Sequence, residues 1–283
     1  MKSKKSALLA FALAVVVLFA ACGGGSSSPS PTPETTPVPV LLVGMECDYA
    51  PFNWTQLNDS NGAVPLGDGT YAGGYDVEIA KLVAESLGMA LQIVKTDWEG
   101  LPPSLTSGKI DAIIAGMTNT EERRETIDFT DDYYTSDLVI VVRKDSEYAS
   151  AENIQDFAGA KITGQHQTLH YDVIDQIEGV DKQQAFPDFP TMVIALTSGR
   201  IDGYVSERPG AISAVASNPD LTYIVFDAES GFDYSSGDVS VAIGIRKEDT
   251  ELKERLNAAL AAISDAQRLE IMESAILNQP MSE

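Results

Sequence analysis

Two twelve-residue segments of this chain are nearly the same: LTSGKIDAIIAG at residues 105–116 and LTSGRIDGYVSE at residues 196–207. Each starts at the end of an apolar helical stretch and passes through a glycine, Gly108 or Gly199, that suits the left-handed conformation after a helix. Each then continues into a short apolar run that is typical of a buried strand. The chain therefore contains the unit helix, tight turn and strand twice, which restricts it to folds in which strands alternate with helices.

The same alternation is found elsewhere in the chain. Residues 76–87 place apolar side chains on one face of a predicted helix, Gly88 ends it, and residues 91–95 predict a strand. Residues 153–157 and 160–164 repeat this order. Strands that alternate with helices indicate an α/β fold with parallel sheets flanked by helices on both faces. Because the chain after residue 40 is too long for one core of ordinary size, we expect two lobes.

The first 21 residues are typical of a signal peptide. Three lysines precede the apolar run ALLAFALAVVVLFAA, which is shorter than the roughly 20 residues of a membrane-spanning helix. The small residues before Cys22 resemble a bacterial lipoprotein processing site, and this resemblance implies that Cys22 becomes the N-terminus and carries the lipid. The alternative is ordinary secretion, with cleavage after Ala21 and no lipid.

Residues 22–40 are rich in Gly, Ser and Pro and hold few apolar side chains, so we expect a disordered tether. Only Cys47 follows Cys22, which leaves no pair for an internal disulfide. These features predict an exported protein that is anchored by Cys22 to the outer face of the cytoplasmic membrane, at the cell surface or in the periplasm.

A formal net charge of −23 disfavours binding to nucleic acid, whose phosphates need basic patches. The charge gives only weak support to a cationic ligand, because an acidic surface mainly keeps a protein in solution. No Ser/His/Asp set or activated cysteine points to catalysis. His166 and His170 are four residues apart, but no third ligand joins them, and the loop at 58–69 lacks the closing glutamate of a calcium site. We therefore predict neither enzyme activity nor a metal or cofactor.

Polar residues follow the two repeated strands, at the sheet edge where open α/β sheets bind ligands. Gly116 and Thr118 come after the first strand, and Glu207 ends the second. Thr118 and Glu121 resemble a capping box, which predicts a helix start with Arg123 in its first turn. Arginine pairs with a carboxylate through two hydrogen bonds, and Glu207 can accept hydrogen bonds from an ammonium group.

Opposite charges that face each other across a cleft would suit a zwitterion such as an α-amino acid. Two simpler alternatives are that Arg123 pairs with the glutamates of its own helix and that Glu207 pairs with Arg208 on the surface. The residues by themselves do not choose between these arrangements.

Five stretches resemble the extracellular solute-binding proteins of family 3, the substrate-binding components of amino-acid ABC importers. They are ECDYAPFNW (46–54), GGYDVEIAKLVAESLG (73–88), DWEGLPPSLTSGKIDAIIAGMTNTEERRETIDFT (97–130), YYTSDLVIVVRKD (133–145) and GRIDGYVSERPGA (199–211). The resemblance covers nearly all of the chain from Leu41 onward. It implies a two-lobed, type II periplasmic-binding-protein fold (a "Venus flytrap"), with lobe 1 at 41–134 and 240–283 and lobe 2 at 135–239.

The resemblance also implies roles for individual residues. The ligand carboxylate would be held by four of them: Arg123, Gly116, Thr118 and Thr168. Glu207 would hold the α-ammonium group, although the family more often has Asp at that place. The loop around Thr168 also departs from the family, which usually has Gly and Ser there.

Three further places match binders of arginine, lysine or ornithine. Tyr49 and Trp98 match two aromatic residues that enclose the ligand side chain, and Glu46 matches an acid that pairs with its cation. A guanidinium between two rings gains about 0.5–2 kcal/mol of cation–π attraction. A neutral ligand would leave Glu46 without a partner, at about 1–3 kcal/mol. The resemblance therefore implies arginine or lysine, with glutamine or histidine as alternatives.

A member of this family would act as a monomer that passes its ligand to a membrane permease and its ATPase. Its lobes would be joined by two crossing strands, near 134–136 and 238–241, and bound ligand would favour the closed form. Some relatives are cleft enzymes of the dehydratase type. The cleft acids here have simpler binding roles, which makes catalysis the less favoured alternative.

Overall fold

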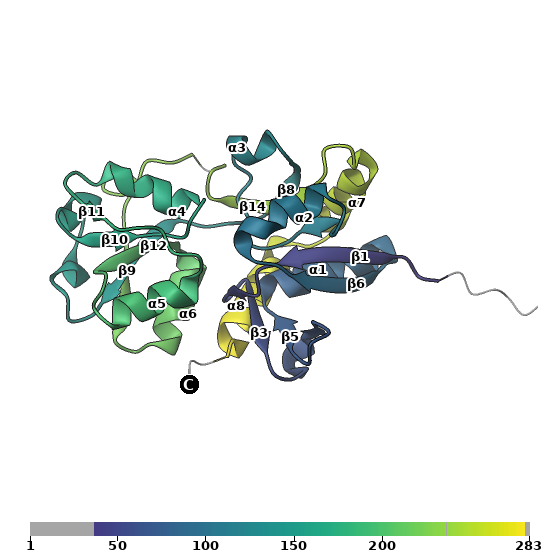
Figure 1. Cartoon of the computed structure of the whole chain (residues 1–283), viewed down its shortest axis with the longest axis horizontal. Coiled ribbons are helices and arrows are strands. Elements are labelled where there is room, and N and C mark those ends of the chain that lie inside the picture. The colour runs from purple at the N-terminus through teal and green to yellow at the C-terminus, as the bar shows by residue number, and fades with distance from the viewer. Residues whose placement is uncertain (1–36, 236, 281–283) are drawn as a thin grey trace, which may run out of the picture. The chain divides into compact units, whose positions relative to one another are not determined.

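The computed structural model describes residues 37–235 and 237–280. The predicted signal peptide (1–21) and Cys22 lie outside these residues, as does most of the predicted tether. From Val38 onward the described chain forms one unit. This unit contains two five-stranded sheets. Helices pack against both of them (Figure 1).

The first sheet has the strand order β6-β1-β7-β14-β8. Three of its strands are parallel: β1 (Val40–Met45), β6 (Ala90–Lys95) and β7 (Ala112–Ile113). The other two are antiparallel to their neighbours: β14 (Ser240–Ile245) and β8 (Asp128–Thr135).

The second sheet has the order β11-β10-β12-β9-β13. It also has three parallel strands: β10 (Lys161–Thr163), β11 (Asp181–Lys182) and β12 (Gly203–Glu207). Its two antiparallel strands are β9 (Leu138–Arg143) and β13 (Leu221–Val225).

Each sheet contains the predicted parallel strands, and two antiparallel strands that were not predicted make both sheets mixed. The chain leaves the first sheet through β8, builds the second sheet and returns through β14. Because the outgoing and returning strands are neighbours, they have to run in opposite directions. The prediction of a two-lobed α/β fold is confirmed: we call the first sheet with its helices lobe 1 and the second sheet with its helices lobe 2.

Both copies of the repeated segment form the predicted unit of helix, turn and strand. The helices α2 (Leu101–Thr106) and α5 (Phe189–Thr197) each end before a glycine with positive φ, 75° at Gly108 and 73° at Gly199. The strands that follow are β7 and β12. Both strands point their carboxyl ends toward the boundary between the lobes, where the ligand edge was expected.

The helix predicted at residues 76–87 is α1 (Tyr75–Leu87), whose buried face includes Val77, Ile79 and Val83. The other α-helices are α3 (Glu121–Arg124), α4 (Leu169–Asp172), α6 (Arg208–Ser217), α7 (Thr250–Ala261) and α8 (Asp265–Asn278). Short 3-10 helices are η1 (Ser60–Gly62), η2 (Trp98–Gly100), η3 (Glu147–Ser150), η4 (Ile154–Phe157) and η5 (Val173–Gln176). A small antiparallel sheet beside lobe 1 consists of β2 (Asp48–Tyr49), β3 (Asn53–Gln56), β4 (Val64–Pro65) and β5 (Tyr71–Gly73).

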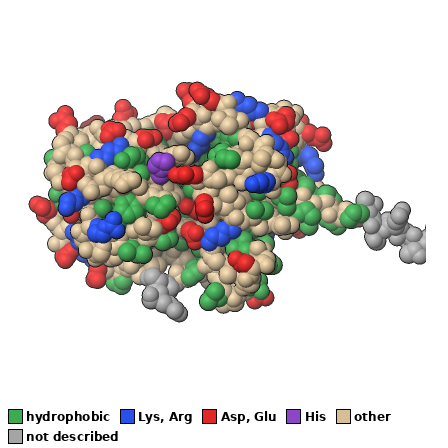
Figure 2. All heavy atoms as spheres, viewed as in Figure 1, with side chains coloured by type: hydrophobic (Ala, Val, Ile, Leu, Met, Phe, Trp, Pro, Cys, Tyr) green, Lys and Arg blue, Asp and Glu red, His purple; other side chains and the backbone are tan. Residues whose placement is uncertain are grey.

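Two segments connect the lobes, one after β8 and one before β14 (Figure 1). They are hydrogen-bonded to each other: the hydroxyl oxygens of Thr135 and Ser240 are 2.9 Å apart, and the Ser136 amide donates to the Val239 carbonyl (3.4 Å). Acidic side chains are spread over the face seen in Figure 2. Within the described ranges, no helix combines the length and apolar composition needed to cross a bilayer.

Candidate ligand-binding site

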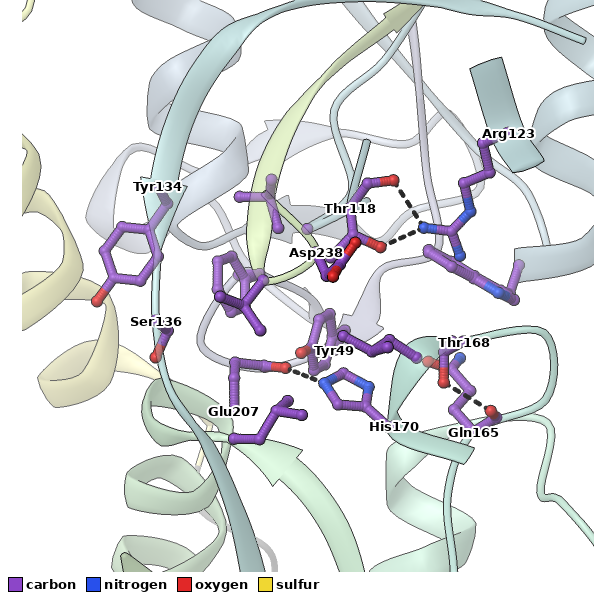
Figure 3. A pocket seen from close by; sticks show the side chains of 17 residues that line it. Tyr49, Thr118, Arg123, Tyr134, Ser136, Gln165, Thr168, His170, Glu207 and Asp238 are labelled. Atoms are coloured by element: carbon purple, nitrogen blue, oxygen red, sulfur yellow. Dashed lines mark hydrogen bonds and ion pairs between the residues drawn. The ribbon is translucent and has the colours of Figure 1, made fainter. Parts of the chain in front are cut away.

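A cavity of about 30 Å³ lies between the lobes, at the carboxyl ends of β7 and β12. Figure 3 shows its walls, which come from both lobes and from the connecting segments. The cavity brings together seven of the predicted site residues: Tyr49, Trp98, Gly116, Thr118, Arg123, Thr168 and Glu207. The eighth, Glu46, does not line it. A space of this size holds about one water molecule, so an amino acid can enter only if the walls move apart.

Arg123 belongs to lobe 1 and reaches lobe 2. Its Nη1 donates to the carbonyl oxygen (2.8 Å) and to Oγ1 (2.5 Å) of Thr118, and its Nη2 donates to the carbonyl of Gln167 in lobe 2 (2.9 Å). Its Cζ lies 5.2 Å from the ring centroid of Trp98. Burial lowers the pKa of Arg123 to about 10, so the guanidinium remains a cation at neutral pH.

The helix that carries Arg123 is not capped as predicted. The N-cap is Thr120, whose side chain accepts from the Arg123 amide (3.3 Å), and α3 is only four residues long. The prediction that Thr118 caps this helix was therefore wrong. Thr118 instead pairs with Val241 in an isolated β-bridge, and its hydroxyl oxygen accepts a hydrogen bond from the guanidinium of Arg123.

A buried hydrogen-bond network fixes the position of Gly116. Its amide donates to the Tyr133 hydroxyl (3.1 Å), which in turn donates to Oδ1 of Asp76 (2.7 Å). Asn53 donates to the other oxygen of Asp76, and burial raises the pKa of this carboxyl to about 6. A side chain at residue 116 would meet the Tyr49 ring at 2.9 Å, and φ is +59°, so the position requires glycine.

Glu207 lies on the lobe 2 side of the cavity and is 9% exposed. Its Oε2 is 2.7 Å from Nε2 of His170, while Arg208 pairs with Asp137 instead. Burial raises the pKa of Glu207 to about 8. Burial, and then the charge of Arg123, lower the pKa of His170 to about 4. The acid and the imidazole therefore form a buried pair inside the cavity wall.

Glu46 lies in lobe 1 and is 5% exposed. Its Oε1 accepts from Nε2 of Gln165 in lobe 2 (2.9 Å), and Gln165 itself lines the cavity. Burial raises the pKa of Glu46 to about 7; the Gln165 hydrogen bond lowers it, and the charge of Asp48 raises it. Oε2 of Glu46 has no hydrogen-bond partner in the described part of the chain.

Tyr49 and Trp98, the two aromatic residues predicted to enclose the ligand side chain, pack against other side chains of the protein. Tyr49 stacks on Phe52 (5.1 Å between centroids) and on Phe189 of lobe 2 (4.3 Å). Trp98 lies under the guanidinium of Arg123. A flat ligand group could stack on Tyr49 in place of Phe189 only after lobe 2 moves away.

Four of the contacts between the lobes lie around the cavity. Two have been described, Arg123 with the Gln167 carbonyl and Glu46 with Gln165. The third is the stacking of Tyr49 on Phe189, and the fourth is the exposed pair of His166 Nδ1 and Glu99 Oε1, 2.7 Å apart. The structure is therefore a closed arrangement of the two lobes.

The sequence analysis did not identify Gln165 and His170 as site residues, although both line the cavity. His170 was noted only for its spacing from His166, and the structure directs these two histidines to different acids, Glu207 and Glu99. No local pattern predicts these pairs, because each joins two elements that are far apart in the chain.

The arrangement is suited to recognition of charges. It presents a fixed cation, a buried acid–imidazole pair and aromatic walls. In the described ranges, no group of three His, Cys, Asp or Glu side chains is placed to hold a metal ion. Burial raises the pKa of the Cys47 thiol to about 12, which makes it a poor nucleophile.

Comparison of the sequence with known protein families also indicates a binding protein. The model of the bacterial extracellular solute-binding proteins, family 3, matches residues 41–277. The chain belongs to this family. The family name describes a protein that binds a solute outside the cytoplasm, in agreement with a cavity between two lobes.

Relatives of this solute-binding protein differ in their ligands. The arginine-binding extracellular protein ArtP of Bacillus subtilis is 29% identical over 81% of this chain and 83% of its own. The L-cystine-binding protein TcyJ of Escherichia coli is 30% identical over 78% of this chain and 76% of its own. The arginine-bound form of truncated ArgBP from T. maritima is 35% identical, with a TM-score of 0.66 over 80% of this chain and 96% of that one. Family membership therefore does not choose the ligand.

The raised pKa of Glu46 predicts a pH-dependent closure of the ligand-free protein. Gln165 of lobe 2 covers this carboxyl only in the closed arrangement, so the proton is bound more tightly there, and its contribution to closure is lost as pH rises from about 4.5 to about 7. Small-angle X-ray scattering of the ligand-free protein should therefore give a smaller radius of gyration at pH 4.5 than at pH 8. Glu46→Gln should reduce this difference, and exposed Glu85→Gln, the control, should keep it. Equal radii at the two pH values in the unaltered protein would contradict the prediction.

Proposed function

We propose that this solute-binding protein captures a basic amino acid, arginine or lysine, and delivers it to the permease and ATPase of an ABC importer. It would act by binding and not by catalysis. The observation that carries the proposal is a single cavity with the cation of Arg123 on the lobe 1 side and the acid of Glu207 on the lobe 2 side. An α-amino acid has a carboxylate and an ammonium group to match these two.

The partners of Arg123 support its role as the carboxylate clamp. Nη1 is held by Thr118, so the guanidinium plane is fixed before the ligand arrives, while Nη2 bonds to a lobe 2 carbonyl that departs when the lobes separate. Thr168 and Gly116 line the same cavity and would complete the grip. A pre-oriented guanidinium binds a carboxylate through two parallel hydrogen bonds.

Glu46 supports the choice of a basic side chain. It is a buried acid with one unpaired oxygen, and its present partner Gln165 belongs to the opposite lobe. A guanidinium or ammonium group that replaced Gln165 would satisfy both oxygens and favour the ionised acid. The rings of Tyr49 and Trp98 would enclose the ligand side chain.

Binding is expected to be selective for basic amino acids. The measurement is calorimetric titration of the purified, processed protein with arginine, lysine, histidine, glutamine and glutamate. Arginine or lysine should bind most tightly, and Glu46→Gln should weaken this binding about tenfold or more while changing glutamine binding little. Tighter binding of glutamine or glutamate than of either basic amino acid would overturn the specificity. Absence of binding by every amino acid would overturn the function.

Closure is expected to depend on the ligand. The cavity is too small for an amino acid to enter between closed lobes, so the free protein has to open at the connecting segments. Small-angle X-ray scattering should give a larger radius of gyration for the free protein than for the arginine-saturated protein. Equal radii in both conditions would refute a ligand-driven closure.

We also propose that a lipid on Cys22 anchors the protein to the membrane. The support comes from the small residues before Cys22 and the Gly/Ser/Pro-rich segment after it. Cells fed radiolabelled palmitate should incorporate label into the protein, and Cys22→Ala should abolish the label and release the protein from the membrane fraction. A labelled or membrane-bound Cys22→Ala variant would contradict the anchor, and Cys47→Ala is the matched control.

A further inference from the structure

Three buried polar atoms in or beside the cavity have no hydrogen-bond partner in the part of the chain that the structure describes. They are Oε2 of Glu46, Oε1 of Glu207 and Nδ1 of His170. Buried polar atoms are rarely left unpaired in folded proteins. The proposed function supplies partners for the two carboxylate oxygens, namely the side-chain cation and the α-ammonium group of the ligand. It supplies none for Nδ1 of His170.

The His170 imidazole has a fixed place in the cavity wall. Its Nε2 is 2.7 Å from Oε2 of Glu207, and its ring meets the ring of Phe189 edge-on at 5.9 Å. Its backbone is packed so closely that a side chain on Gly164 would come within 2.8 Å of the His170 carbonyl group. Figure 3 shows the ring between Glu207 and Thr168, with its second nitrogen on the side away from Glu207.

The protons of the Glu207–His170 pair determine whether Nδ1 of His170 is a hydrogen-bond donor or acceptor. Burial raises the pKa of Glu207 to about 8, and burial together with the Arg123 charge lowers that of His170 to about 4. The 2.7 Å between Oε2 and Nε2 is a hydrogen-bond distance, so one proton lies between these two atoms, and burial favours its place on the acid. The imidazole, which accepts that proton at Nε2, carries its own hydrogen on Nδ1. Nδ1 is thus a buried donor without an acceptor.

We propose that His170 is a ligand-binding residue that connects the two charged ends of the bound amino acid. Its Nδ1–H donates to the ligand carboxylate beside Arg123, while its Nε2 side holds Glu207 against the α-ammonium group. The inference rests on the proposed function, because it needs a ligand that has both groups. When the ammonium group meets Glu207, the bridging proton moves from Oε2 to Nε2: the O–H bond breaks, the N–H bond forms, and no proton leaves the pair.

This arrangement makes His170 a specificity-determining residue for a free α-carboxylate. The imidazolium that forms on binding lies near the cation of Arg123, and only an anion between them offsets the repulsion. A ligand whose carboxylate is replaced by a neutral amide gives Nδ1–H a weaker acceptor and leaves the two cations unbalanced. His170 therefore adds to the discrimination that Arg123 provides.

The test compares arginine with argininamide by calorimetric titration at pH 7. Two variants separate the two nitrogens, since the amide nitrogen of Gln can replace Nε2 and that of Asn can replace Nδ1. His170→Gln should weaken arginine binding about tenfold and leave argininamide binding nearly unchanged. His170→Asn should keep the preference for arginine. His166→Gln, at the exposed pair with Glu99 outside the cavity, is the matched control and should leave the ratio of the two affinities unchanged.

Equal weakening of both ligands by His170→Gln, or no effect on either, would overturn the role of His170. Loss of the arginine preference in His170→Asn would overturn it as well. Thermal unfolding of each variant shows whether it is folded, and if one variant does not fold the other still decides. If the unaltered protein fails to bind arginine, the proposed function fails, whereas unchanged variants of an arginine-binding protein refute only the present inference.

Discussion

Burial of charge is costly unless each charge finds a partner, and this constraint governs the space between the lobes. One guanidinium and three acids line or adjoin a single small cavity, and two of the acids, Glu46 and Glu207, each keep one oxygen without a partner among the described residues. Arg123 and Glu46 take one partner each from the opposite lobe. The partners that hold the lobes together are thus the ones that a zwitterionic, cationic ligand would replace.

The replacement of these protein partners by ligand groups explains how a bound ligand can favour the closed arrangement. Hydrogen bonds between Ser213 and Gln279 cross the boundary away from the cavity. Of the four contacts described around the cavity, three involve residues that line it. A ligand that replaces them with charge-assisted hydrogen bonds stabilises closure by the difference between the two sets. The contacts around the cavity differ in strength. A buried hydrogen-bond network fixes Gly116, whereas an exposed pair such as His166 and Glu99 contributes little to stability.

The sequence predicted those features that depend on local spacing. The helix at 76–87 and the two repeated units follow from apolar periodicity and from glycines at the turns. The direction of the antiparallel strands could not be predicted, because it depends on where the chain returns after building lobe 2. Thr118 and Thr120 both fit a capping pattern, and only the contact of Thr118 with Arg123 decides between them. His170 was missed because its partner lies on another element.

The place of β14 in the first sheet determines which lobe can fold first as the chain is made. This strand lies between β7 and β8, yet it is made only after the whole of lobe 2. As the chain is made from its N-terminus, β8 emerges with no neighbour in its own sheet, whereas every strand of the second sheet is present once β13 has been made. The lobe that begins second is therefore the first that can be completed.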